Sequence, residues 1–565
     1  MKRIIYLLFI LFLTACHKDT DIFIPNPEAP VVNVTTSIGG TVIDDNNAPV
    51  PGAIVQLGTE TKETDDNGVF IFRNVEVDSK RAFVKVTKAG YFQGSRAILP
   101  NENVITNVRV QLLTNEEIGT IAATTGGEIV LPSGAVIDFP ANSVANYSGD
   151  IAVSVQYLDP TTNDLGWKMP GDLTGITSDN QTHALISFGM IAIYLEDTDG
   201  NELQLAEDKE IEINLPISEG LLAEAPAVPL PLWMFDENSQ NWIEKGTATI
   251  IGTERYVGKI TNGTFWNFAK GLRQVNLSGE ITNGDREPLP SIKVAVVTSS
   301  GAMVSAGWTD NSGTYSGKVP SDRPLFVRII DECNTTVVNQ TIGLFTAATN
   351  TFDLVEIDND LPLTSFRGSI LNCDNNLVGE GYAKFHTAGD HVEIVWIDEE
   401  GKYQSNFINC ESDAAVELVV INKNNGLESI ASDYFGNNID AGDIVVCNDF
   451  VEFITYKVDD DRFLEKDPYA QKSDNEDKTT IGGESSGVVF TLDITGAERG
   501  NGFGVSQIEV NNLVSAPSVA PQVKVNFSTY DGVEEYLIGT FSGEFKDSEG
   551  FDRELSGTFR IIRDN

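Results

Sequence analysis

The chain has few positively charged residues for its length. It carries 38 Lys and Arg against 83 Asp and Glu among 565 residues, which gives a formal net charge of -45. Proteins that neutralise phosphates need basic patches, so this balance argues against nucleic acid as a partner. It also argues against adsorption to an anionic lipid surface through a basic face. We interpret the excess acid as a solvated coat that keeps the protein soluble.

Long hydrophobic runs and long amphipathic helices are also missing. The apolar stretch from Ile4 to Leu13 is too short to span a bilayer and has the length of a signal-peptide centre. The rest of the chain consists of short alternating runs broken by Gly, Asn, Asp and Pro. In residues 209–217, for example, Ile211, Ile213 and Leu215 alternate with polar neighbours. Period two with dense turn signals predicts antiparallel strands, and therefore an all-β chain of tandem β-sandwich domains.

Residues suited to catalysis or to metal and cofactor binding are scarce. None of the four histidines (His17, His183, His386 and His391) has a Glu three positions later, and no C-x-x-C or P-loop motif occurs. The G-x-S-x-G match at 483–487 lies in a polar stretch with no later histidine. We therefore predict no catalytic residue, no metal and no cofactor. Two weaker alternatives are a metal shared by His386 and His391, and calcium at acidic turns such as 65–67, 310–311 and 459–461.

Cysteine is rare, with five residues in all. Cys16 lies three residues after the end of the apolar stretch. The other four are an even number and could form one or two disulfides in an oxidising compartment, while buried thiols are the alternative. The sequence leaves the pairing open among Cys333, Cys373, Cys410 and Cys447.

One pattern occurs three times along the chain. It consists of a Gly-containing strand, a polar turn and a second strand, and it appears at residues 39–57, 278–296 and 367–385. Each copy is followed by an acidic turn ending in glycine, at 64–70 (TDDNGVF), 309–315 (TDNSGTY) and 397–403 (IDEEGKY). Glycine after several Asp, Asn or Glu residues is typical of a turn that needs a positive φ. The pattern predicts three copies of one β-module.

The first copy resembles the carboxypeptidase regulatory-like domain. The resemblance lies in G-x-V-x-D-x-x-x-x-P-V-x-G-A-x-V at 40–55, T-D-x-x-G-x-F at 64–70 and V-x-K-x-G-Y at 86–91. It implies a transthyretin-like β-sandwich of the carbohydrate-binding-like class, which serves mostly as an accessory unit. The peptidase domain itself is not expected, because its zinc-binding histidines are missing. The second copy lacks the Gly-Tyr end, and the third lacks the prolines.

Residues 117–270 do not repeat this pattern. TGGEIVLPSGAVIDFPANSV at 125–144 and the later strand KEIEINLPI resemble the ZU5-like modules of surface and receptor proteins. The same region holds three tryptophans that could stack on sugars. Apolar neighbours favour a packing role for Trp233, Trp242 and Trp266.

The N-terminus resembles that of a Bacteroidota-type outer-membrane lipoprotein. Leu13-Thr14-Ala15-Cys16 is similar to a lipobox, which implies cleavage after residue 15 and lipid attachment at Cys16. The following His17-Lys18-Asp19 partly matches signals for the outer face of the outer membrane. The prolines of the next stretch favour an extended tether.

These patterns predict a rod of five β-domains on a lipid anchor. A signal peptide (1–15) and a lipidated tether (16–36) precede module 1 (37–113, regulatory-like), module 2 (117–271, ZU5-like), module 3 (274–357, regulatory-like), module 4 (363–448, divergent regulatory-like) and module 5 (449–565), the last with a disordered insert at 465–487. We expect a non-catalytic protein on the cell surface that binds or presents a glycan or a protein. The alternatives are a structural envelope spacer without a ligand and, less expected, a divergent glycan-processing enzyme.

Overall fold

The computed structural model describes residues 32–564, apart from gaps at 101–104, 359, 388–390, 412–414, 430, 435, 448–451, 460, 474–476, 486–487 and 531. Almost all of the regular structure in these residues is β-strand, so the predicted all-β fold is confirmed. Their one α-helix, α1 (Leu165–Lys168), has four residues. No helix in the described part of the chain has the length and apolar character needed to cross a membrane. The predicted signal peptide and Cys16 lie outside the described residues.

Module 1 is a sandwich of two small sheets. One has the order β4-β1-β7 and the other β3-β2-β5-β6. Their strands are β1 (Asn33–Ile43), β2 (Ile54–Leu57), β3 (Glu60–Glu63), β4 (Val69–Asp78), β5 (Ala82–Thr87), β6 (Gly94–Ile98) and β7 (Ile105–Gln111). Alternating apolar residues, among them Ile38, Phe72 and Val84, fill the space between the sheets with no exposed surface. β1 begins at Asn33, four residues before residue 37, where module 1 was predicted to start.

Modules 3 and 4 repeat this arrangement. In all three modules the first strand lies in the centre of its sheet. β1 pairs antiparallel with β4, β18 with β21, and β26 with β29. The glycine that precedes each of these partner strands has a positive φ: 69° at Gly68, 71° at Gly313 and 71° at Gly401. An L side chain rarely adopts this conformation, which explains why glycine recurs there.

The bounds in module 3 are β18 (Phe265–Asn283), β19 (Lys293–Thr298), β20 (Met303–Trp308), β21 (Thr314–Pro320), β22 (Pro324–Ile330), β23 (Thr336–Leu344), β24 (Thr349–Thr351) and β25 (Val355–Ile357). In module 4 they are β26 (Leu363–Leu371), β27 (Gly381–Thr387), β28 (His391–Trp396), β29 (Lys402–Ile408), β30 (Val416–Asn422), β31 (Leu427–Glu428), β32 (Ser432–Tyr434) and β33 (Asn438–Val445).

Module 2 has a large core that continues into module 3. Its strands are β8 (Gly119–Ala122), β9 (Gly127–Val130), β10 (Val136–Phe139), β11 (Asp150–Leu158), β12 (Thr174–Ile176), β13 (Thr182–Glu196), β14 (Ile211–Pro216), β15 (Leu230–Asp236), β16 (Asn241–Ile251) and β17 (Arg255–Ile260), with a 3-10 turn at Glu219–Leu221. The 19-residue strand β18 then runs on into module 3, so the predicted break at 272–273 lies inside a strand. The two modules are joined without a linker at this point.

Module 5 forms one curled sheet of ten strands. They are β34 (Phe453–Val458), β35 (Asp461–Glu465), β36 (Tyr469–Lys472), β37 (Thr479–Ser485), β38 (Val488–Thr495), β39 (Gly500–Val510), β40 (Leu513–Val514), β41 (Lys524–Tyr530), β42 (Tyr536–Lys546) and β43 (Asp552–Ile562). The prediction of a disordered insert at 465–487 is wrong, because β36 and β37 pair with each other there. Their alternate residues Ala470 and Ile481 are fully buried. The average hydrophobicity of residues 465–487 is low because only one face of the β36–β37 hairpin is buried.

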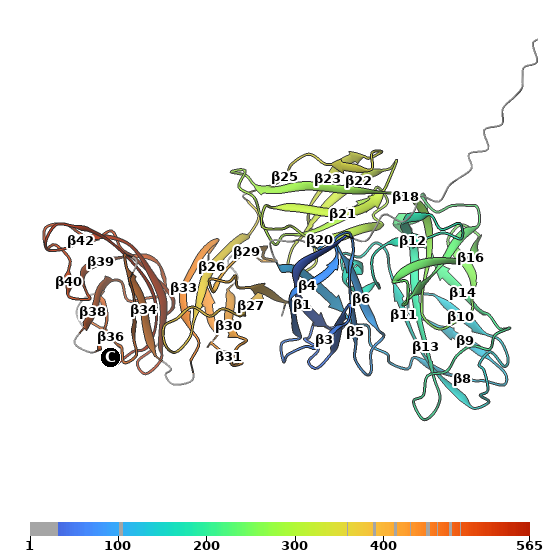
Figure 1. Cartoon of the computed structure of the whole chain (residues 1–565), viewed down its shortest axis with the longest axis horizontal. Helices are drawn as coiled ribbons and strands as arrows, with labels where there is room; N and C mark the ends of the chain where they lie inside the picture. Colours follow the sequence, from blue (N-terminus) through green and yellow to red (C-terminus); the bar gives the residue numbers. More distant parts are fainter. Residues whose placement is uncertain are drawn as a thin grey trace, which may run out of the picture.

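The modules are not arranged as a simple rod. Module 1 lies in the middle of the molecule, beside modules 2, 3 and 4, while module 5 lies at the far end (Figure 1). Arg109 of module 1 binds Glu393 of module 4, which is 284 residues away in the sequence. Period-two patterns specify which face of a strand is buried inside a module, but they carry no information about such contacts between modules.

Candidate functional site

Modules 1, 3 and 4 meet at a buried cluster of four charged side chains. Lys293 Nζ on β19 lies 2.7 Å from Glu332 Oε2 and 2.6 Å from Glu393 Oε1. Arg109 Nη2 on β7 lies 2.7 Å from the same oxygen of Glu393, which is on β28. All four side chains belong to residues that are at most 8% exposed. Buried charges require partners, so this cluster fixes the three modules relative to one another.

The cluster holds its two carboxyl groups in different protonation states. Burial and the neighbouring Glu393 raise the pKa of Glu332 to about 8. Burial also opposes ionisation of Glu393, but Arg109 and Lys293 outweigh it and hold the pKa of that carboxyl well below its usual range. Burial, assisted by the same two cations, lowers the pKa of the adjacent His391. At neutral pH the cluster therefore holds a protonated Glu332 beside an ionised Glu393.

The raised pKa of Glu332 predicts that the folded protein loses stability as the pH rises above neutral. Its folded-state pKa of about 8 lies above the ordinary value of 4.5, so its contribution is fully present below pH 4.5 and is lost as the pH rises through 8. Between pH 7 and 9, we expect the melting temperature of the wild type to fall about 2 to 4 °C more than that of Glu332→Gln, which cannot ionise. His391 does not contribute in this window, because its lowered pKa confines its effect to acid pH. Equal falls in the two proteins would contradict the assignment.

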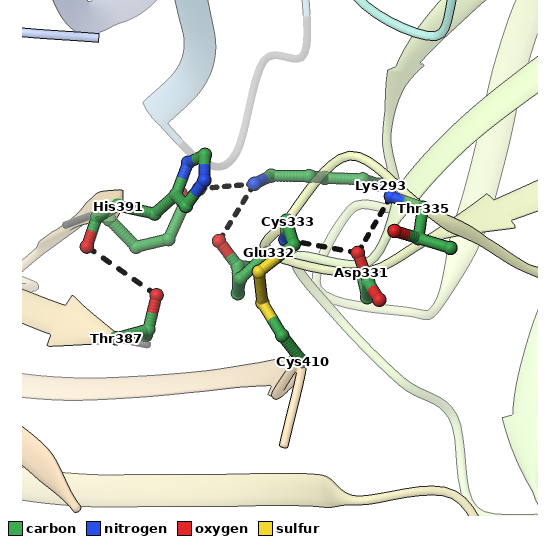
Figure 2. The surroundings of a disulfide bond; sticks show 9 residues. Lys293, Asp331, Glu332, Cys333, Thr335, Thr387, His391 and Cys410 are labelled. Carbon is green, nitrogen blue, oxygen red and sulfur yellow. Dashed lines mark hydrogen bonds and ion pairs between the residues drawn. A yellow bond between two sulfur atoms is a disulfide. The ribbon is translucent and has the colours of Figure 1, made fainter. Parts of the chain in front are cut away.

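A disulfide lies next to the cluster. Cys333 directly follows Glu332 in module 3 and is bonded to Cys410 of module 4 (Figure 2). The backbone N–H of Glu332 donates to the carbonyl of Ile408, at the end of β29. The second disulfide, Cys373–Cys447, lies within module 4. All four cysteines singled out in the sequence thus form disulfides, one of which ties module 3 to module 4.

A cleft of about 360 Å³ opens beside the charge cluster. Its walls come from β1, β4 and β7 of module 1, from the 309–313 turn of module 3, and from β28, β29 and the turn between them in module 4. The side chains most relevant to binding are Arg73, Asn107, Trp308, Asn311, Trp396 and Gln404. Glu332 and Glu393 lie at its floor, where Lys293 holds both. The acidic turn of module 3 and that of module 4 thus both line this cleft.

One wall of the cleft is held by the packing of the Trp396 indole against the backbone of Gly39. Trp396 of module 4 lies against Gly39 in β1, where an added Cβ would be 2.5 Å from two indole carbons. An edge-to-face contact with Tyr382 at 5.7 Å limits the movement of this indole. On the other wall, Trp308 stacks on Trp167 of module 2 with ring centroids 4.4 Å apart. The wall residues are therefore fixed by contacts outside the cleft.

Replacing Gly39 by alanine is expected to loosen module 1 from module 4. The added methyl group would displace the Trp396 indole, and overpacking of this kind costs about 1–3 kcal/mol. The free energy of unfolding, measured by denaturant titration, should fall by this amount. Gly246→Ala is the matched control, because its Cβ would meet nothing closer than 3.8 Å. A loss no larger than that of the control would contradict the packing argument.

The acidic turn of module 1 also contacts module 4. Asp65 Oδ2 accepts from Tyr382 Oη at 3.1 Å and from Lys423 Nζ at 2.8 Å. Lys384 Nζ donates to Asn67 Oδ1 at 2.7 Å. These oxygens, considered as calcium ligands in the sequence, are instead bound to N–H and O–H donors at a module interface.

The other candidate residues are distributed across the fold. Trp233, Trp242 and Trp266 are at most 1% exposed, so their predicted packing role is confirmed. His386 and His391 lie on the neighbouring strands β27 and β28, and no metal-binding group of three His, Cys, Asp or Glu is found among the described residues. The residues of 483–487 that are described belong to strand β37 and not to a strand-to-helix elbow.

The sequence reading missed the four residues of the charge cluster. One weak signal existed, because Lys293 interrupts the apolar run of SIKVAVV at 291–297 and lies on a strand whose residues are all buried. A charge within such a strand requires a buried partner. Nothing in the sequence indicates that the partner is Glu393 of another module.

Comparisons with known proteins give no family. No protein-family model matches the chain, and no curated protein matches it. Among solved structures it is similar to the shaft pilin SpaA of Lactobacillus rhamnosus GG, at 11% identity over 31% of this chain and 98% of that one, with a TM-score of 0.17. A Streptococcal ancillary pilin matches at 10% identity over 40% of this chain and 95% of that one, with a TM-score of 0.14.

The Bacillus anthracis TIE protein matches at 10% identity over 74% of this chain and 67% of that one, also with a TM-score of 0.14. Similarities this low carry no argument about function.

Proposed function

We propose that this chain is a non-catalytic, lipid-anchored protein of the outer membrane that faces the cell exterior and binds a ligand, with carbohydrate as the ligand class. The observation that carries the proposal is the interlocked junction of modules 1, 3 and 4, which leaves a polar cleft between them. A spacer without a ligand gains nothing from folding module 1 back against module 4, because this arrangement shortens its reach. A rigid cleft between modules is a common setting for ligand binding.

The two carboxylates at the floor of the cleft favour binding over hydrolysis. A glycosidase needs one carboxyl group as an acid and another as a base or nucleophile, both facing the substrate. Here Glu332 and Glu393 are at most 8% exposed, and both contact Lys293. Their carboxyl groups are engaged by Lys293 and, for Glu393, also by Arg109, so they support the cleft and are not free to act as a catalytic pair.

The anchor is tested by replacing the cysteine of the lipobox-like motif. Cys16→Ala is expected to move the protein from the membrane fraction to the soluble fraction, because it loses its acyl chains, each CH₂ of which contributes about 0.8 kcal/mol. The melting temperature should not change. Thr20→Ala, four residues later, is the control and should stay in the membrane fraction. Retention of the Cys16→Ala protein in the membrane would refute the anchor.

The orientation and the ligand class need separate experiments. Protease treatment of intact cells should remove the protein if it faces the exterior, and resistance to the protease would overturn surface display. Binding of purified full-length protein to an array of glycans tests the ligand class. An array without a positive signal would refute carbohydrate binding and leave the envelope spacer as the better reading.

A further inference from the structure

The cleft between modules 1, 3 and 4 is lined largely by polar side chains without charge. In a chain with 83 acidic and 38 basic residues, the exposed walls of the cleft are dominated by amides, hydroxyl groups and indoles. The lining acids at its rim are Asp398 and Glu399, and Asp398 Oδ1 already accepts two backbone N–H groups of its own turn. The cleft thus combines two exposed carboxylates at its rim with uncharged polar walls.

Several lining groups are suited to an oxygen-rich ligand. Asn107 and Gln404 come from opposite walls, and each amide can both donate and accept hydrogen bonds. Buried N–H groups of Arg73, Trp308 and Trp396 have no hydrogen-bond partner among the described residues. These atoms have no exposed surface, so they hold the walls and are not the groups that would contact a ligand. The two half-buried indoles add apolar surface to the walls through the parts that their packing partners leave exposed.

The cleft is formed before any ligand arrives. Three independent devices hold its walls: the Arg109–Glu393–Lys293 cluster, the Cys333–Cys410 disulfide and the packing of Trp396 on Gly39. Asn406 on β29 also donates to the carbonyl of Pro290 across the boundary between modules 3 and 4. Preformed walls reduce the ordering cost of binding, which matters for flexible ligands such as oligosaccharides.

We propose that this cleft binds a short neutral oligosaccharide. The inference rests on the proposed function, because it names the site and the ligand class of that binding. The volume of about 360 Å³ lies within the range of ligand pockets. Asp398, Glu399 and the net charge of -45 disfavour an anionic glycan. An extended peptide could pair with the edge strand β29, but the amides and indoles of the walls favour a sugar.

Calorimetric titration of the purified full-length protein tests the site. The probes are neutral tetrasaccharides of glucose, mannose, xylose and N-acetylglucosamine, with heparin and an extended peptide as the other ligand classes. Gln404→Glu and Asn311→Asp each keep the shape of an exposed side chain but remove its N–H donors. Each is expected to weaken the Kd for a bound tetrasaccharide about tenfold.

Two control variants carry the same changes outside the cleft. Gln507→Glu lies on an exposed position of β39, and Asn46→Asp lies in an exposed turn of module 1. Both should leave the Kd unchanged within about twofold. If all four variants bind a tetrasaccharide like the wild type, the site is elsewhere and only the proposed function survives. Binding of heparin or the peptide alone would overturn the ligand class, and a protein that binds none of the probes would lose both proposals.

Discussion

Glu393→Ala is expected to separate module 1 from modules 3 and 4 and to lower the free energy of unfolding of this part by about 3–5 kcal/mol. Glu393 is the counter-ion of both Arg109 and Lys293. Its removal leaves two buried cations with Glu332 as the one remaining carboxyl group; Lys293 keeps its contact with Glu332, but Arg109 loses its ion pair. The loss should appear as a lower first transition in differential scanning calorimetry.

Two further variants test whether the loss of stability is specific to the buried cluster or would follow from the loss of any ion pair. Arg367→Ala breaks an ion pair with Asp440 whose side chains are 71% and 54% exposed, and it should cost no more than about 0.5 kcal/mol. Replacing Arg109 and Lys293 by Met and both Glu332 and Glu393 by Leu removes the charges as well as the need for partners, and it should recover most of the lost stability. If Glu393→Ala behaves like Arg367→Ala, the cluster does not hold the modules together.

Removal of the disulfide between modules 3 and 4 has the second large expected effect. Cys333 and Cys410 are 77 residues apart in the sequence. In the chain-entropy model, a cross-link that closes a loop of this length stabilises the folded state by about 4.5 kcal/mol, which is lost when the disulfide is removed. We therefore expect the double replacement Cys333→Ser with Cys410→Ser to lower the melting temperature of the junction. Reduction of the wild type opens both disulfides, so calorimetry should show a larger shift for the reduced wild type than for this variant.

The other disulfide provides the matched control. Cys373–Cys447 closes a loop of similar length, with a separation of 74 residues, but both of its ends lie in module 4. Its removal should destabilise module 4 to a similar extent while leaving modules 3 and 4 covalently linked across the junction. Binding at the cleft should therefore suffer more from loss of Cys333–Cys410. Equal effects of the two double replacements on ligand binding would show that the first disulfide has no special role at the junction.

The sequence predicts the parts of this molecule better than their assembly. Alternating residues such as Ile211, Ile213 and Leu215 identify strands, and Gly68, Gly313 and Gly401 identify the same turn in three modules. Both signals are local, because pleating and a positive φ are properties of a few consecutive residues.

The junction could not be predicted in the same way. Arg109, Lys293 and Glu393 lie on three strands far apart in the sequence, and even Lys293, which interrupts an apolar run, does not indicate which residue is its partner. The hairpin of β36 and β37 was missed for a different reason. Its buried positions, Ala470, Thr479 and Ile481, include a polar residue, so the segment resembles a disordered insert by composition.

The central position of module 1 also has a consequence for biogenesis. Module 1 is made first, but its contact surface on module 4 includes Ile394 and Tyr382, which pack around Val69 and come about 300 residues later. Contacts of such high sequence separation form late in folding. During synthesis, module 1 must therefore keep Arg109 and Val69 uncovered until module 4 has been made. A chain that ended before module 4 would expose this surface permanently, which makes it a target for chaperones and proteases.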